Sequence, residues 1–213
     1  MKFKGIFDGA NKHFNDNLGY YLLTILFMAT GMIVGLYCVK YMQDVDKGSL
    51  INYITTISTS PNGEIMATTK IFINTLKNNL PIIIGLWILG LTFIGAPIVL
   101  LVNLYKGFSL GFTFSFFIYA LKQKGIILAL LGVLPQNLIY VPCIIFLSVI
   151  ALKGSVAGVK EKFSKKYVNS SYTDVRNYTM IYVVTSMIMA AGFLIETFLT
   201  PIFINMVLKG IGA

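Results

Sequence analysis

The chain has 213 residues, of which 56% are hydrophobic and only 12% are charged. This balance lies outside that of soluble domains, and the length leaves room for one membrane domain without a second soluble one. The formal net charge of +9 resides in short segments between apolar runs, which favours membrane lipid with anionic headgroups as the partner and argues against nucleic acid.

Residues 1–18 are too polar to cross a membrane, but their apolar side chains recur at helical spacing with lysines between them. This pattern predicts an amphipathic helix on the cytoplasmic headgroups, with a frayed N-terminus as the alternative. The first apolar run, Gly19 to Val39, lacks a small-x-small cleavage site, so we expect an uncleaved signal-anchor helix.

Residues 40–79 are polar enough to lie outside the membrane. Ser60-Pro61-Asn62-Gly63 is a turn signal between two short amphipathic pieces, which predicts an extracytoplasmic helical hairpin. Its apolar positions either contact a protein partner or only seal the hairpin onto its own membrane domain. The candidate partner contacts are Tyr53, Ile57, Phe72 and Leu76.

Further apolar runs predict four more spans. They cover Ile82 to Leu104, Phe108 to Leu121, Ile126 to Leu152 and a stretch within Tyr178 to Leu208, with a basic cytoplasmic loop at 153–177 between the last two. The Phe108 run has only 14 residues, about 21 Å of helix, against a hydrocarbon core of about 30 Å. A re-entrant third run, which leaves four true spans, is therefore the alternative.

The distribution of lysine and arginine decides between these topologies. With five spans and a cytoplasmic N-terminus, the inner segments carry ten of the 17 basic residues and the outer ones seven. A re-entrant third run reverses that excess, against the rule that positive charge stays inside. We therefore predict an all-α, polytopic bundle of about five transmembrane helices, with 1–213 as one integral membrane domain.

Two glycine pairs are spaced for close helix contact. Gly31 and Gly35, and likewise Gly107 and Gly111, lie one turn apart in apolar runs, so that two backbones can approach closely. The pattern favours packing within one chain, with a homodimer face as the alternative.

The fourth span is interrupted by Pro135 and Pro142. Each proline frees the carbonyl four residues earlier, and the Gln136 and Asn137 amides are placed to donate to such carbonyls. The sequence predicts a kinked or broken helix. Either these amides only satisfy the kink, or they line a polar site of the kind that broken helices form in transporters.

Three further polar residues interrupt apolar runs. Asn103 lies inside the second predicted span, and Lys106 follows it closely enough to snorkel to the cytoplasmic interface. Glu196 is the only acidic residue inside an apolar run, which makes it a functional candidate by default. It also lies near the outer edge of its helix, so a purely structural role stays open.

Motifs of known enzymes are missing from the sequence. It contains no His-Glu-x-x-His, no Gly-x-Ser-x-Gly and no phosphate-binding glycine loop, and His13 is the single histidine. Cys38 and Cys143 support neither a disulfide nor a zinc site. We therefore expect no catalytic residue, no metal site, no cofactor and no enzyme activity.

Several segments together resemble the stage II sporulation protein M family. They are Leu86-Trp-Ile-Leu-Gly-Leu-Thr-Phe-Ile-Gly-Ala-Pro97, Lys106-Gly-Phe-Ser-Leu-Gly-Phe112, Val133-Leu-Pro-Gln-Asn-Leu138 with Pro142, and an ending with Gly192 and Thr200-Pro201. Relatives in the broader membrane family carry His and Glu where this chain has Gln136 and Val141, which favours the sporulation branch.

The resemblance implies a scaffold of the engulfment machinery, on the mother-cell side of the sporulation septum. It implies stage II sporulation proteins P and D, which degrade peptidoglycan, as partners. The alternative from the residues alone is a transporter or channel component, with a hydrated path that touches Asn103, Gln136, Asn137 or Glu196.

Overall fold

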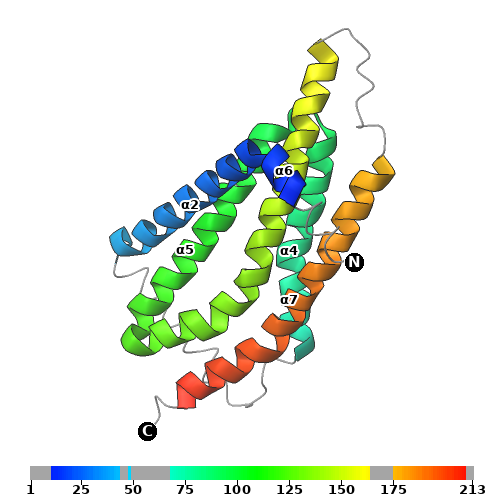
Figure 1. The fold of residues 1–213 in the computed structure, drawn as a ribbon. Helices are drawn as coiled ribbons and strands as arrows, with labels where there is room; N and C mark the ends of the chain where they lie inside the picture. Colours follow the sequence, from blue (N-terminus) through cyan, green and yellow to red (C-terminus); the bar gives the residue numbers. More distant parts are fainter. Residues whose placement is uncertain (1–10, 44–47, 49–67, 164–174, 210–213) are drawn as a thin grey trace.

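The computed structural model describes residues 11–43, 48, 68–163 and 175–209, and this part of the chain is almost entirely helical (Figure 1). Five segments are long and apolar enough to cross a membrane, which confirms the predicted all-α, five-span class. The helices are α2 Leu18–Tyr41, α4 Thr68–Leu91, α5 Gly95–Leu128, a π-helical turn Ala129–Val133, α6 Leu134–Phe163 and α7 Val175–Lys209.

Successive crossings run in opposite directions (Figure 1). The start of α2, the α4–α5 junction, the end of α6 and the start of α7 lie at one end of the bundle, here called the N-terminal end. The end of α2, the start of α4 and the reversal between α5 and α6 lie at the opposite end. This alternation is what five complete crossings require.

The chain turns between α4 and α5 at residues 92–94. Leu89 ends the preceding helix by accepting two bonds from Thr92, one from its backbone N–H at 3.1 Å and one from its Oγ1 at 2.9 Å. Gly95 lies against the Leu89 carbonyl, where a Cβ would collide. Pro97 then falls in the first turn of α5, where its missing N–H is not needed.

The predicted boundary between Leu104 and Phe108 is therefore wrong. α5 continues through Lys106 and Gly107, and the third crossing, Gly95–Ala120, has 26 residues instead of a short re-entrant run. The helix can contain both residues because Asn79 accepts a hydrogen bond from Lys106 and the backbone of α2 packs directly against Gly107.

The chain reverses again at Lys122, which has a φ of 50° and a ψ of −123°. Gly125 then lies against the Phe117 carbonyl, which leaves no room for a side chain. This turn agrees with the predicted end of the third run at Leu121 and start of the fourth at Ile126. The π-helical turn Ala129–Val133 follows, and α6 then continues through Pro142 without interruption.

Two segments that the sequence places outside the membrane overlap helices of the bundle. α4 runs from Thr68 to Leu91 without a break at residue 79, so residues 68–79 of the predicted hairpin share one helix with the second crossing. Asn79 supports the helix by donating from Nδ2 to the Thr75 carbonyl at 3.0 Å. The predicted basic loop 153–177 likewise overlaps the end of α6, which extends to Phe163, and the start of α7 at Val175.

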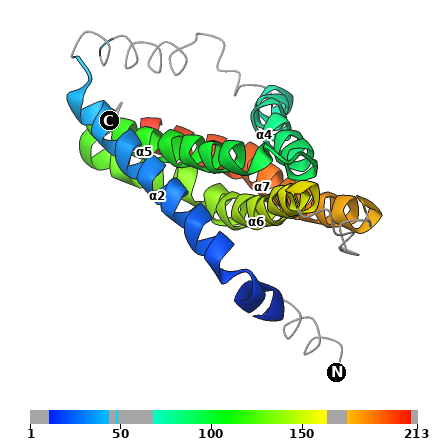
Figure 2. The same ribbon diagram turned by 90° about the horizontal axis from the view of Figure 1, so that it is seen from above.

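The four motif glycines lie where α2 crosses α5 at an angle, with both helices running in the same direction (Figure 2). At each of them a Cβ would collide with a backbone carbonyl of the other helix. The glycines therefore let the two backbones touch directly. The contacts are Gly31 with Leu104, Gly35 with Phe108, Gly107 with Met28 and Gly111 with Met32.

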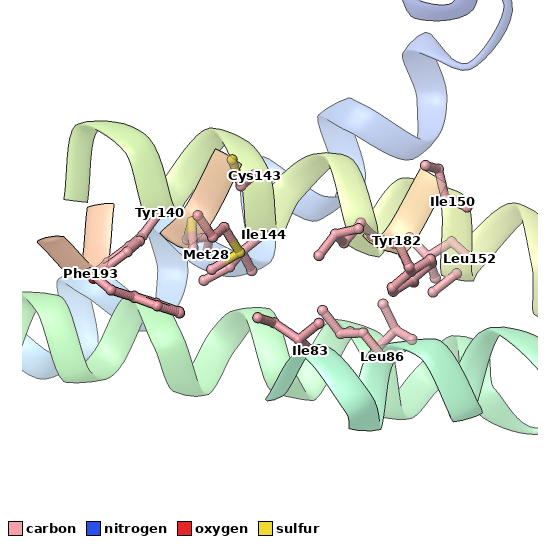
Figure 3. Packing of buried hydrophobic residues seen from close by; sticks show 14 residues of the cluster. Met28, Ile83, Leu86, Tyr140, Cys143, Ile144, Ile150, Leu152, Tyr182 and Phe193 are labelled. Atoms are coloured by element: carbon pink, nitrogen blue, oxygen red, sulfur yellow. The ribbon is translucent and has the colours of Figure 1, made fainter. Parts of the chain in front are cut away.

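The apolar core lies between α4, α5, α6 and α7. Figure 3 shows Ile83 and Leu86 of α4 pointing toward Ile144 of α6 and Tyr182 of α7. Outward-facing side chains are also apolar, and Leu26, Leu138 and Met187 are 61%, 70% and 69% exposed. Such an exterior suits hydrocarbon, and we treat the chain as a multi-pass membrane protein.

The described part of the N-terminal segment, residues 11–16, is helical and contacts the bundle. The His13 ring lies 5.5 Å from the Phe146 ring, and Asn17 donates from Nδ2 to the His13 carbonyl at 2.7 Å. Burial, and then the nearby charge of Lys153, lower the pKa of His13 below its ordinary value. The neutral imidazole is therefore the form that suits this contact.

Candidate functional site: a polar cavity inside the bundle

A cavity of about 480 Å³ lies among the five crossings. Every helix contributes to its wall: α2 through Met28, α4 through two asparagines, α5 and α6 through most of the remainder, and α7 through one glutamate. The polar lining residues are Asn78, Asn79, Tyr105, Lys106, Ser109, Thr113, Gln136, Asn137, Tyr140 and Glu196.

Lys106 reaches this cavity from the middle of α5. Its Nζ donates to Asn79 Oδ1 at 2.9 Å, and Asn79 is itself held by its bond to the Thr75 carbonyl. The prediction that Lys106 snorkels to the cytoplasmic interface is therefore wrong. The ammonium group points into the bundle, where a neighbouring helix supplies its acceptor.

Glu196 reaches the cavity from α7. Its Oε2 accepts a bond of 2.8 Å from the Tyr140 hydroxyl of α6. One turn earlier, Gly192 lies against the Tyr140 ring, where a Cβ would crowd the ring. Gly192 thus lets α7 approach α6 closely enough for the tyrosine to reach the carboxylate.

The two charged groups attract each other across the cavity without a direct ion pair. Lys106 interacts electrostatically with Glu196, but each makes its hydrogen bond to a neutral side chain instead. The cavity therefore contains one positive and one negative group that are each held by one bond. An arrangement of this kind binds polar groups.

Gln136 and Asn137 line the cavity from the first turn of α6. Asn137 donates from Nδ2 to the Val133 carbonyl at 2.7 Å, at the end of the π-helical turn. The prediction that one of these amides bonds the backbone is confirmed, although the carbonyl is neither that of Leu131 nor that of Leu138.

Asn103 lies outside the cavity, fully buried between α5 and α6. Its Nδ2 donates to the Val99 carbonyl and to Ser148 Oγ, both at 2.8 Å, while its Oδ1 has no hydrogen-bond partner. Pro142 lines a different, apolar cavity of about 570 Å³. Asn103 therefore links α5 to α6, and neither residue lines the polar cavity.

The candidate partner contacts fall in two groups. Tyr53 and Ile57 lie outside the described residues. Phe72 is 37% exposed, and with Leu76 it lines an apolar groove of about 490 Å³ between α4 and α7. Phe72 and Leu76 thus belong to the flank of the second crossing instead of a separate hairpin.

A sequence profile of stage II sporulation protein M matches residues 24–201. The chain belongs to this family. The match extends from within α2 into α7 and includes every residue that lines the polar cavity. No curated protein and no solved structure matches the chain.

In this member of the stage II sporulation protein M family, six polar cavity residues were not predicted from the sequence, namely Asn78, Asn79, Tyr105, Ser109, Thr113 and Tyr140. Two of them, Asn79 and Tyr140, bond to the charged groups. Asn79 was placed at the end of the predicted hairpin and so outside the membrane. The amide pair Asn78-Asn79 directly before an apolar run could have indicated a polar site. Tyr140 lies among apolar residues and gives no local signal of its hydroxyl bond. Groups of three or more potential metal ligands are not found in the described part of the chain.

Proposed function

We propose that this protein is a non-enzymatic membrane scaffold of the endospore engulfment machinery. In this role it assembles and localises the peptidoglycan-degrading stage II sporulation proteins P and D at the septum, on the mother-cell side. The family match over 24–201 carries the proposal. A multi-pass helical bundle and a sequence without enzyme motifs are consistent with it.

The proposed contact surface is the Lys40 to Asn79 segment together with the flank of α4 and α7. Specific interfaces bury about 800 Å² of surface per partner. A short surface segment offers less area than this, so helix faces must supply the remaining contact area. The apolar groove that begins at Phe72 and Leu76 offers such a face beside the start of the second crossing.

The test follows engulfment in sporulating cells. Loss of the protein should block membrane migration after asymmetric division, because the wall hydrolases no longer collect at the septum. Phe72→Ser should weaken that recruitment several-fold, measured by fluorescence of tagged partners at the septum. Ile73→Ser is the matched control, since Ile73 is 43% exposed on the same helix but does not line the groove.

Protein level in the membrane has to be measured in the same cells. If every substitution that scatters the hydrolases also removes the protein from the membrane, the segment is structural and the contact proposal fails. Normal hydrolase localisation in the absence of the protein overturns the scaffold role itself.

A transport or channel role is a second candidate, because the polar cavity brings Lys106, Gln136, Asn137 and Glu196 together. Transport requires access to this cavity from both membrane surfaces in turn. In a variant that lacks the two native cysteines, Gln136→Cys should then react with impermeant thiol reagents added on either side. Reaction from neither side rejects this role.

A further inference from the structure

We propose that the polar cavity is a binding site for a zwitterionic molecule that carries a primary ammonium group and an anionic phosphate or carboxylate group. The inference goes beyond the scaffold role and does not depend on it, because binding is a property of the purified protein. It rests on the charges of the cavity, its other polar groups and the position of its mouth.

The two charged groups of the cavity favour a ligand with both charges. Lys106 has three N–H donors and gives one to Asn79, and the Glu196 carboxylate accepts one bond from Tyr140. Both groups therefore retain bonding capacity toward the cavity. A ligand with a single charge compensates only one of them and leaves the other poorly solvated, which is costly in a membrane interior. A zwitterion matches both at once.

Neutral polar groups in the cavity wall and the cavity volume also suit such a ligand. Ser109 and Thr113 of α5 add hydroxyl groups to the wall, and the Thr113 hydroxyl donates to the Ser109 carbonyl at 2.8 Å. The Ser109 hydroxyl can therefore donate to an oxygen of a phosphate or carboxylate, and the Thr113 oxygen can accept from an ammonium group. The volume of about 480 Å³ lies within the range of about 300–1,000 Å³ that is usual for small-molecule sites.

The mouth of the cavity lies on the flank of the bundle. Tyr105 is 61% exposed, and Asn78 and Ser109 are exposed as well, whereas Lys106 and Glu196 are half-buried. Tyr105 lies about 15 Å along α5 from its first residue, near the middle of the crossing. Because this position lies away from both ends of the crossing, the opening faces the bilayer and favours a lipid as the source of the zwitterionic group.

The test uses the full-length protein in detergent and native mass spectrometry with equimolar lipids. Phosphatidylethanolamine has the required primary ammonium, phosphatidylcholine has no N–H donor and phosphatidylglycerol has no cation. We expect phosphatidylethanolamine to bind at least about tenfold more tightly than either. Calorimetry with phosphoethanolamine tests the soluble source, and binding of that compound without the lipid assigns the site to a soluble zwitterion.

Two variants tie the binding to the cavity. Lys106→Met and Glu196→Gln should each weaken the preferred ligand about tenfold or more, whereas Lys106→Arg should retain much of the binding. Lys153→Met is the control, because Lys153 is exposed and does not line the cavity. Glu196→Gln keeps an oxygen that accepts the Tyr140 bond, so it remains informative if Lys106→Met does not fold.

Equal binding of all three lipids, with no binding of phosphoethanolamine, overturns the proposal. Ligand preference that persists in both charge variants overturns it as well. Hydrolase localisation in cells that carry Glu196→Gln is scored separately, so that failure of the ligand site and failure of the scaffold role remain distinguishable.

Discussion

Three asparagines inside the bundle make the same local bond. Asn79, Asn103 and Asn137 each donate from Nδ2 to the backbone carbonyl four residues earlier in their own helix. An amide donor in hydrocarbon must find an acceptor, and the preceding turn is always within reach. The side chain can then use its other atoms between helices, as Asn79 does for Lys106.

Asn137→Leu tests this local role. The change leaves the Val133 carbonyl without its side-chain donor at the π-helical turn and should lower the free energy of unfolding by about 1–2 kcal/mol. Thermal unfolding of the purified protein in detergent measures the effect. Leu138→Met, at a position that is 70% exposed, is the neighbouring control and should be neutral. An Asn137→Leu protein as stable as the parent shows that the bond is dispensable.

At the scale of elements, the α2–α5 pair is built on direct backbone contact. Gly31 and Gly35 of α2 face Gly107 and Gly111 of α5 at successive turns, so the helices dock along a stripe without side chains between them. Both helices use their motif in the same contact within one chain. These glycines are therefore occupied and do not form a free face for a second copy.

Gly107→Ala should disrupt this contact. The added methyl group collides with the Met28 carbonyl, which cannot move aside as a flexible side chain does, and overpacking of this kind costs about 1–3 kcal/mol. A reduced melting temperature at unchanged oligomeric state is the expected result. Gly85→Ala is the matched control, because a Cβ there meets nothing within 4 Å. Loss of a dimer with no loss of monomer stability contradicts the intramolecular contact.

At the scale of the whole molecule, five crossings place the start of α2 and the end of α7 at opposite ends of the bundle (Figure 1). The start of α2 and the segment between α6 and α7 lie at the same end. The sequence concentrates lysine and arginine in residues 1–18 and 153–177, so by the positive-inside rule we expect this end to face the cytoplasm.

Cysteine labelling in intact cells checks this orientation. In a variant with Cys38 and Cys143 replaced by serine, Lys162→Cys should be protected from an impermeant thiol reagent, and Asn62→Cys should react. Permeabilisation should make Lys162→Cys reactive, which proves that the thiol is competent. Labelling of Lys162→Cys from outside rejects the N-inside arrangement.

The sequence alone determined the class of the protein and the number of its crossings. Transfer of an apolar run into hydrocarbon, and the need of its backbone to bond internally, are local properties of about 20 residues. A polar residue inside such a run can also be recognised locally, because hydrocarbon disfavours it. Lys106, Gln136, Asn137 and Glu196 were all identified as candidates in this way.

Only the tertiary structure decided where these residues lie and what they meet. Hydropathy placed a helix end at Lys106, because a charge in an apolar run usually marks an interface. Asn79 of another helix satisfies that charge, so α5 continues and the turn falls at Thr92 instead. The partner of a buried polar group is a long-range property. For this reason the sequence could name the charged residues of the cavity, but the packing of five helices had to bring them together.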